Sequence, residues 1–392
     1  MKKIAFFMAT PFTLGGEQRV VSIVSNMLYK KGYDVTIVCT DLTTPINYKT
    51  YNLDKNIKIG YVRGFNNKLV TKIRDYRWKL YYKNLESGIY KNSLFIQKFI
   101  NCDFITKVLL KRSFKGYDYI ISLSTIYNTM LAGVSKKIKA KTIGWQHGMT
   151  NVYFMKEKWR HYNQELYSKY MFDNLDSYVV LTKKDGNRLE ELFDNVKSVV
   201  INNPKPFVSN KKTNLKNKQF LAVGRFDNVK NHLMLIDMFN EFHKKNKDWK
   251  LVIVGEGELK NDYIKKIKEY NLEKYIIIKN YTNNVEKYYL SSSILLMPSL
   301  YEGWSMVMNE AMEYGLPLIT FDLNCSHEII TNGKSGFIVE NYNKEKYVKC
   351  MLELANDKNK LKRFSQNTIE ISKIKSNDRI LNEWNELIKS LK

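Results

Sequence analysis

Two glutamates that flank a predicted helix start are the first residues here whose spacing can carry chemistry. Glu302 and Glu310 lie in SLYEGWSMVMNEAMEYGLPLI, residues 299–319, just after the apolar run Ile294–Met297. The apolar spacing from about Ser305 predicts a helix, and the first amides of a helix attract anions because they have no partner within it. Two carboxylates beside such a site suit a ligand with hydroxyl groups on both sides of a diphosphate, such as a nucleotide sugar.

The backbone between these glutamates supplies the predicted anion site. Its amides belong to Trp304, Ser305, Met306 and Val307, and Gly303 lets the chain approach a ligand closely. Ser305 is also the expected N-cap, with or without a ligand. The alternative interpretation is that both glutamates are ordinary solvated carboxylates.

A pair of cations follows another predicted strand. Arg225 and Lys230 lie in VGRFDNVKN, residues 223–231, after Gly224. A guanidinium and an ammonium in such a turn can bind a diphosphate and neutralise its charge as it leaves. The alternative is that they are two surface cations among 64.

A third turn holds the pair Gly15-Gly16, between the first predicted strand and the first predicted helix. These glycines can bring backbone amides close to a phosphate. The motif is not GxGxxG, and only Asp41 lies near the end of the second strand, which disfavours a dehydrogenase.

Short apolar runs alternate with amphipathic stretches along the whole chain, which favours parallel sheets covered by helices. Glu17–Lys31 reads as the first helix and Asp378–Leu391 as a closing helix. The predicted strands are Ile4–Ala9, Val35–Cys39, Ile59–Val62, Tyr119–Leu123, Thr142–Trp145, Tyr178–Leu181, Val199–Ile201, Phe220–Val223, Leu251–Val254, Tyr275–Ile278, Ile294–Met297, Leu318–Phe321 and Phe337–Val339.

The 392 residues are enough for two cores. The polar stretch 202–218 marks the boundary, so we expect an α/β protein with two Rossmann-like domains, residues 1–203 and 204–375. Residues 376–392 are expected to return to the first domain.

The net charge of +25 points to an anionic partner. Four scattered cysteines and five histidines predict neither disulfides nor a metal cluster. The apolar part of MKKIAFFMATPFTLGG lies at the lower limit of length for a signal peptide and meets a proline, so we interpret it as a first buried strand. No stretch is long enough to span a bilayer.

Together these motifs resemble glycosyltransferase family 4, whose members are retaining enzymes of GT-B architecture. The resemblance rests on the GG loop, the G-R-x(4)-K-N turn, the G-E-G at Gly255–Gly257 and the E-x(7)-E helix, and it runs from Lys3 to about Val339. It implies that Arg225 and Lys230 bind the donor diphosphate. It also implies that Glu302 faces the donor sugar, Glu310 faces the ribose, and the GG loop, with Gly224 and Gly255, lies near the donor.

The resemblance further places His147, in IGWQHGMTN, at the reacting centre; the alternative is a structural loop histidine. Many relatives have Gly-Pro where this chain has Asn324-Cys325-Ser326-His327 before Glu328, so the identity of the donor sugar stays open.

No D-x-D motif occurs in the sequence. We therefore predict that neither a metal nor another cofactor is needed, and that the leaving diphosphate itself accepts the acceptor's proton.

The segment Arg63–Lys115 combines basic residues with aromatic side chains, which predicts a surface for anionic lipid. The predicted acceptor is a saccharide linked to polyprenyl diphosphate, and the expected location is the cytoplasmic face of the plasma membrane. A lysine-rich solvated face is the alternative, and no nucleic-acid motif is present.

The predicted function is transfer of a hexose or N-acetylhexosamine, from a UDP-sugar in preference to a GDP-sugar, in bacterial surface polysaccharide or glycan synthesis. Two alternatives remain: a nucleotide-sugar epimerase of the same fold, and a non-catalytic protein that binds anionic membranes or glycans.

Overall fold

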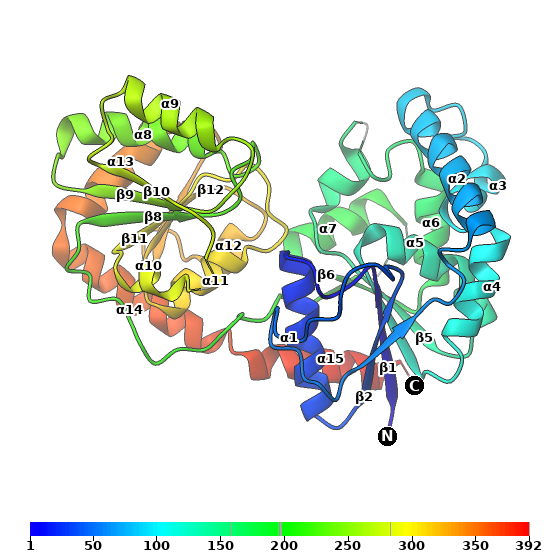
Figure 1. The fold of residues 1–392 in the computed structure, drawn as a ribbon. Helices are drawn as coiled ribbons and strands as arrows, with labels where there is room; N and C mark the ends of the chain where they lie inside the picture. Colours follow the sequence, from blue (N-terminus) through cyan, green and yellow to red (C-terminus); the bar gives the residue numbers. More distant parts are fainter. Residues whose placement is uncertain (158, 195, 197, 283, 392) are drawn as a thin grey trace. The chain divides into compact units, whose positions relative to one another are not determined.

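The computed structural model describes residues 1–157, 159–194, 196, 198–282 and 284–391. Lys392, at the end of the predicted closing segment, lies outside this range. The chain divides into two compact units, residues 1–204 with 377–392, and residues 205–376. Each unit is a parallel sheet with helices on both faces (Figure 1).

The first unit contains a seven-stranded sheet in the order β3-β2-β1-β4-β5-β6-β7. All its strand pairs are parallel. Its strands are β1 (Lys3–Met8), β2 (Asp34–Cys39), β3 (Lys58–Tyr61), β4 (Tyr119–Leu123), β5 (Lys141–Trp145), β6 (Ser177–Val180) and β7 (Ser198–Val200). Its helices are α1 (Gly16–Lys30), α2 (Lys68–Ser87), α3 (Leu94–Asn101), α4 (Phe104–Ser113), α5 (Ser124–Val134), η1 (Ser135–Lys137), η2 (Asn151–Met155), α6 (Glu165–Asn174), α7 (Lys183–Leu192) and α15 (Asn377–Ser390).

The second unit contains a six-stranded parallel sheet in the order β10-β9-β8-β11-β12-β13. Its strands are β8 (Gln219–Val223), β9 (Lys250–Val254), β10 (Ile276–Lys279), β11 (Ile294–Met297), β12 (Leu318–Phe321) and β13 (Gly336–Val339). Its helices are α8 (His232–Lys245), α9 (Lys260–Glu269), α10 (Glu286–Leu290), α11 (Met306–Glu313), α12 (Ser326–Ile329), α13 (Lys344–Asn356) and α14 (Lys358–Ile374).

The predicted fold class is confirmed, and each predicted apolar run forms a strand with ends shifted by at most one residue. These runs are recognisable because strands that are covered on both faces must be apolar at consecutive positions. In β4, for example, all five residues are buried.

The C-terminal helix α15 belongs to the first unit, where it lies beside α1 (Figure 1). Trp384 is fully buried and packs edge-on against Trp145, with 4.7 Å between ring centroids. The Tyr33 hydroxyl donates to Asn385 at 2.8 Å. The chain therefore leaves the first unit at residue 204 and completes that unit's core at its end.

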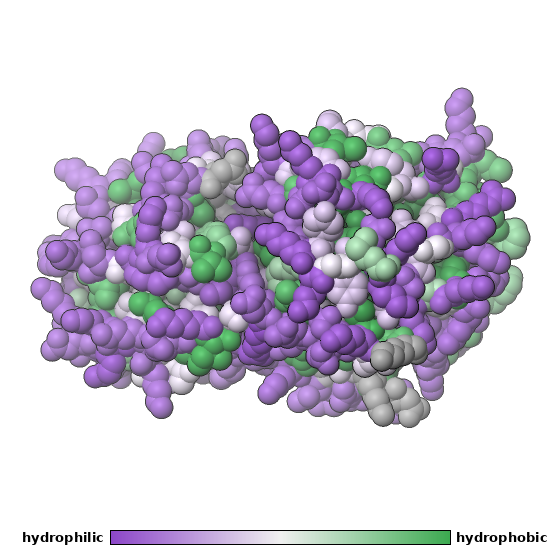
Figure 2. All heavy atoms as spheres, turned by 90° about the horizontal axis from the view of Figure 1, so that it is seen from below, coloured by the Kyte–Doolittle hydropathy of each residue, from purple (hydrophilic) through white to green (hydrophobic). Residues whose placement is uncertain are grey.

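The face of the molecule drawn in Figure 2 is predominantly hydrophilic. On the face drawn in Figure 2, hydrophobic side chains are dispersed among hydrophilic ones. Within the described residues, no helix has both the length and the apolar character needed to cross a bilayer.

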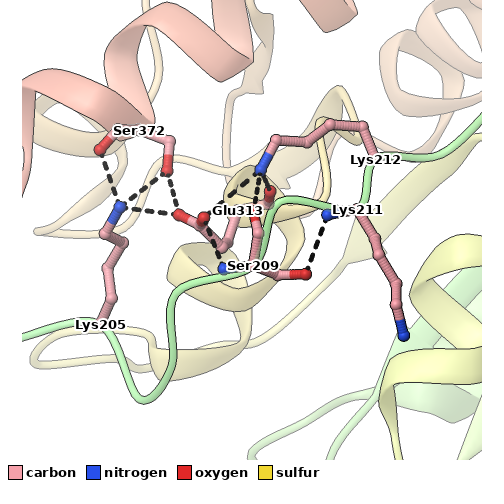
Figure 3. Close-up of polar contacts among 6 residues, drawn as sticks. All are labelled: Lys205, Ser209, Lys211, Lys212, Glu313 and Ser372. Carbon is pink, nitrogen blue, oxygen red and sulfur yellow. Dashed lines mark hydrogen bonds and ion pairs between the residues drawn. The ribbon is translucent and has the colours of Figure 1, made fainter.

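A buried ion pair ties the start of the second unit to two of its helices (Figure 3). Lys205 donates to Glu313, the last residue of α11, at 2.7 Å and to the Ser372 carbonyl of α14 at 3.1 Å. The Ser209 amide and the Ser372 hydroxyl also donate to the Glu313 carboxylate. Burial opposes the charge of Glu313, but these hydrogen bonds outweigh it and keep its pKa below the usual value.

We expect Glu313→Ala to lower the free energy of unfolding by about 3–5 kcal/mol, because it leaves Lys205 buried without its counter-charge. Urea denaturation followed by tryptophan fluorescence measures this change. Glu370→Ala is the matched control, since it removes a carboxylate from an exposed ion pair with Lys373, where the expected loss is about 0–1 kcal/mol. Equal losses in the two variants would contradict the anchoring role of Glu313.

Candidate functional site

The two turns with predicted donor residues meet at the point where the strand order of the second sheet reverses. The chain crosses from β8 to β9 on one side and joins β11 on the other. Turns at the carboxyl ends of two such strands are where open α/β sheets bind ligands. Arg225 and Lys230 follow β8, and Glu302 follows β11.

Lys230 and Glu302 form an ion pair across this point. Their side chains are 17% and 13% exposed, so both charges are largely withdrawn from water while still reachable. Asp227 accepts from the Lys230 amide at 3.0 Å, which fixes the turn. A Cβ on Gly224 would lie 3.1 Å from Lys230 side-chain carbons, so this glycine gives the lysine its path to Glu302.

Arg225 is placed differently from Lys230. Its side chain is 79% exposed and pairs with Asp227 at 3.1 Å. Gly255 allows a close contact between two backbone segments, because a Cβ there would lie 1.8 Å from the Gly224 carbonyl oxygen. The turns after β8 and β9 can pack together only with glycine at that position.

The start of α11 presents the predicted amides. Ser305 is the N-cap and accepts from the Met308 amide at 3.3 Å, as the sequence predicts. The amides of Met306 and Val307 lie at the first two helical positions, before any intrahelical bond. Trp304 is 6% exposed and the Lys375 ammonium lies over its ring. Gly303 lies between Glu302 and Trp304 and is partly exposed.

Glu310 faces the interior of the second unit. It is 3% exposed, and its carboxylate accepts from the Tyr289 hydroxyl at 2.6 Å. The interpretation of Glu310 as an ordinary solvated carboxylate is therefore wrong. A role toward a ribose remains a prediction.

Gly15 and Gly16 belong to the first unit, at the corresponding reversal between β1 and β4. Gly16 begins α1, and the Gly15 amide donates to the Tyr51 hydroxyl at 2.7 Å. A Cβ on Gly16 would meet no atom within 4 Å, so space for a ligand exists beside it.

Glu17 is a candidate functional residue that the sequence reasoning missed. Its Oε1 atom is buried and has no hydrogen-bond partner among the described residues. Burial raises the pKa of this carboxyl to about 7, although the nearby Arg160 lowers it. The sequence feature that could have indicated Glu17 is its position directly after Gly15-Gly16, in the first turn of α1.

His147 follows β5 in the first unit and packs against Trp145, with 4.4 Å between ring centroids. Its Nε2 atom is buried without a partner in the described part of the chain. Burial lowers the pKa of the imidazole to about 3, so the ring is neutral at pH 7. A neutral imidazole can donate or accept a hydrogen bond without adding charge.

Comparisons with known proteins identify the class of enzyme to which this chain is similar. Residues 205–371, almost all of the second unit, match the family model Glycosyl transferases group 1. Over 221 residues the chain is 34% identical to the amylovoran biosynthesis glycosyltransferase AmsD of Erwinia amylovora, covering 54% of this chain and 62% of AmsD. An uncharacterized glycosyltransferase of Haemophilus influenzae is 28% identical over 99% of this chain and 100% of its own. The chain is a glycosyltransferase with a group 1 domain.

One solved structure is similar in fold, and one further relative is similar in sequence over part of this glycosyltransferase. The crystal structure of S. aureus TarM, a complex that contains UDP, superposes with a TM-score of 0.76 at 17% identity, over 99% of this chain and 100% of TarM. An Escherichia coli UDP-Gal:alpha-D-GlcNAc-diphosphoundecaprenol alpha-1,3-galactosyltransferase is 29% identical over 36% of this chain and 37% of its own. The predicted enzyme class is confirmed.

We expect Glu17 to make the stability of the glycosyltransferase depend on pH. Its ordinary pKa of 4.5 rises to about 7 in the folded state, so the folded state holds a proton that the unfolded state has lost between these values. The free energy of unfolding therefore falls as pH rises from 4.5 through 7, by about 3 kcal/mol in total. Urea denaturation at pH 5 and pH 8 measures the difference.

The Glu17→Gln variant keeps the shape of the side chain but does not titrate. Its stability should change less than that of the wild type between pH 5 and pH 8. An identical pH dependence in both proteins would show that Glu17 is ionised at low pH like an ordinary carboxyl.

Proposed function

We propose that this glycosyltransferase moves a hexose or N-acetylhexosamine from a UDP-sugar to a lipid-linked saccharide, with retention of configuration and without a metal ion. The observation that carries the proposal is the Lys230–Glu302 pair beside the start of α11. Lys230 supplies a cation for a diphosphate, Glu302 supplies an acceptor for sugar hydroxyls, and the first amides of α11 lie in the same group of turns.

The donor diphosphate would lie against these turns. Lys230 and the Met306 and Val307 amides would neutralise its charge, and Arg225 would close over it from its exposed position. Glu302 would accept hydrogen bonds from the sugar, so the ion pair of the ligand-free protein would become a three-part contact among cation, sugar and phosphate. Charge stabilisation of the leaving group is the main catalytic effect expected of such a site.

We also propose that the donor carries UDP and that transfer needs no metal ion. UDP is supported by the E. coli relative's name and by the contents of the TarM crystal. Lys230 and Arg225 supply the positive charge that a divalent ion supplies elsewhere. The leaving diphosphate would accept the acceptor's proton, and the role of His147 at the reacting centre stays a prediction.

The acceptor is proposed from the E. coli relative, whose name contains diphosphoundecaprenol. The name of AmsD adds amylovoran biosynthesis as a second context. An epimerase would need no acceptor surface, whereas segment Arg63–Lys115, with its mixed basic and aromatic residues, would supply one. A non-catalytic protein would not need Lys230 and Glu302 held together away from water.

The segment Arg63–Lys115 would rest on the cytoplasmic face of the plasma membrane. Phe95 and Phe104, at the starts of α3 and α4, are 83% and 74% exposed. Phe65 and Phe114 are instead buried in the core of the first unit. The proposed lipid surface therefore uses only part of the aromatic set that the sequence suggested.

We expect Lys230→Ala and Glu302→Gln each to reduce sugar transfer from a UDP-sugar by at least about 100-fold, because each removes a charge from the proposed leaving-group site. Transfer to a lipid-linked saccharide is measured after a panel of nucleotide sugars has identified the donor by thermal shift. EDTA should leave the wild-type rate unchanged.

Lys218→Ala is the matched control, because Lys218 pairs with Asp248 on the exposed surface of the same unit. Its rate should stay within a factor of two of the wild type. A Lys230→Ala enzyme with more than half of the wild-type rate would refute the assignment.

We expect the double variant Phe95→Ser/Phe104→Ser to bind phosphatidylglycerol vesicles roughly tenfold more weakly, since it loses two exposed rings that would enter the headgroup region. Vesicle sedimentation measures the partition, and added salt should weaken wild-type binding further. Val208→Ser, which removes another exposed apolar side chain, should bind as the wild type does. Unchanged partition of the double variant would reject this surface.

A further inference from the structure

The first unit contains a pocket that the proposed donor site does not use. It lies among α2, α3, α5 and the segment after η2. Its lining includes Arg74, Trp78, Thr125, Ile126, Arg160 and His161. Arg77 also lines it, but this guanidinium is committed to Asp103 at 2.5 Å and to the Ile100 carbonyl at 2.9 Å.

Two side chains of this lining have unused hydrogen-bonding capacity. Arg160 is exposed, and its guanidinium makes no hydrogen bond or ion pair with any described residue. His161 is 4% exposed, and neither of its ring nitrogens has a partner within the described chain. A buried polar atom without a partner has lost its hydrogen bonds to water, so a ligand that supplies a partner restores them.

His161 is held in place by its neighbours. Its ring stacks on Phe154, with centroids 4.7 Å apart, and its amide donates to the Tyr153 carbonyl at 2.8 Å. Burial, aided by Arg160, lowers the pKa of the imidazole to about 3. The neutral ring therefore has one N–H to donate at pH 7.

The start of α5 contributes a third feature. Thr125 and Ile126 line the pocket from the first turn of this helix, and no side chain caps its amides. Ser124, the first helical residue, has φ of 61°, a conformation that is strained for a residue other than glycine. Uncapped amides at a helix start attract anions.

We infer that this pocket binds the diphosphate group of a prenyl-linked acceptor, with Arg160, His161 and the first amides of α5 as hydrogen-bond donors. Arg74 adds a second positive charge; its bonds to the Phe65 carbonyl and Thr71 hydroxyl are long, at 3.3 and 3.4 Å. Trp78, Ile126 and Met130 add apolar side chains to the lining, but the cavity of about 50 Å³ accommodates only the polar end of such a ligand, so the isoprenyl chain would lie outside it. The inference rests on the proposed function, because it assumes that the acceptor is lipid-linked.

Farnesyl diphosphate is the probe for this pocket, and calorimetric titration of the full chain measures its binding. Arg160→Ala should weaken binding roughly tenfold to a hundredfold, because it removes a charged hydrogen-bond donor. Arg160→Lys should recover part of the loss, since it keeps the charge without the planar fork. Lys139→Ala, an exposed cation of the same unit outside the pocket, should bind within a factor of two of the wild type.

Further ligands separate the sources of recognition. Inorganic pyrophosphate should compete with farnesyl diphosphate, whereas farnesol should not, and excess UDP should not displace the probe. Unchanged affinity in Arg160→Ala, equal losses in Arg160→Ala and Lys139→Ala, tight binding of farnesol, or full displacement by UDP would each overturn the assignment.

Kinetics separate this inference from the proposed function. Arg160→Ala should raise the KM for a lipid-linked acceptor more than it lowers kcat. If the wild type transfers sugar but this KM does not change, the pocket assignment alone fails. If the wild type transfers no sugar while farnesyl diphosphate still binds through Arg160, the proposed function alone fails.

Discussion

The second unit depends on how helix α11 is held at its C-terminal end. Glu313 receives hydrogen bonds from Lys205, Ser209 and Ser372, and Lys212 donates to the Glu313 carbonyl at 2.6 Å. Cations at this end complement the helix dipole. Because the other end of α11 follows the Glu302 turn, a helix fixed here keeps its free amides beside Glu302 and Lys230.

Both units place reactive groups at the reversal of strand order, but they do so with different chemistry. In the second unit, Lys230 and Glu302 neutralise each other while no ligand is present. In the first unit, the Oε1 atom of Glu17 is buried without a hydrogen-bond partner among the described residues, and burial raises the pKa of this carboxyl to about 7, so it is about half protonated at pH 7. The first arrangement holds two opposite charges together, whereas the second leaves a single carboxyl that gains or loses a proton near neutral pH.

The structure shows which positively charged side chains are buried and which are exposed, and composition alone does not. Arg77 is buried and pairs with Asp103, whereas Arg160 is exposed and its charge acts on the carboxyl of Glu17. The same side-chain type therefore stabilises one helix contact and remains available to an anion in the next. Net charge therefore indicates anionic partners only through cations that the fold leaves accessible.

The sequence by itself determined the strands, the two Rossmann-like units and the turns after β8 and β11, because apolar runs and helix-start signals are local. It also predicted the Ser305 cap. Only the tertiary structure decided that Lys230 meets Glu302, 72 residues away, that Arg225 stays exposed, and that Phe65 and Phe114 enter the core. It alone revealed the unsatisfied atoms of Glu17 and His161. Burial and pairing arise from segments distant in the chain, so no local pattern of residues encodes them.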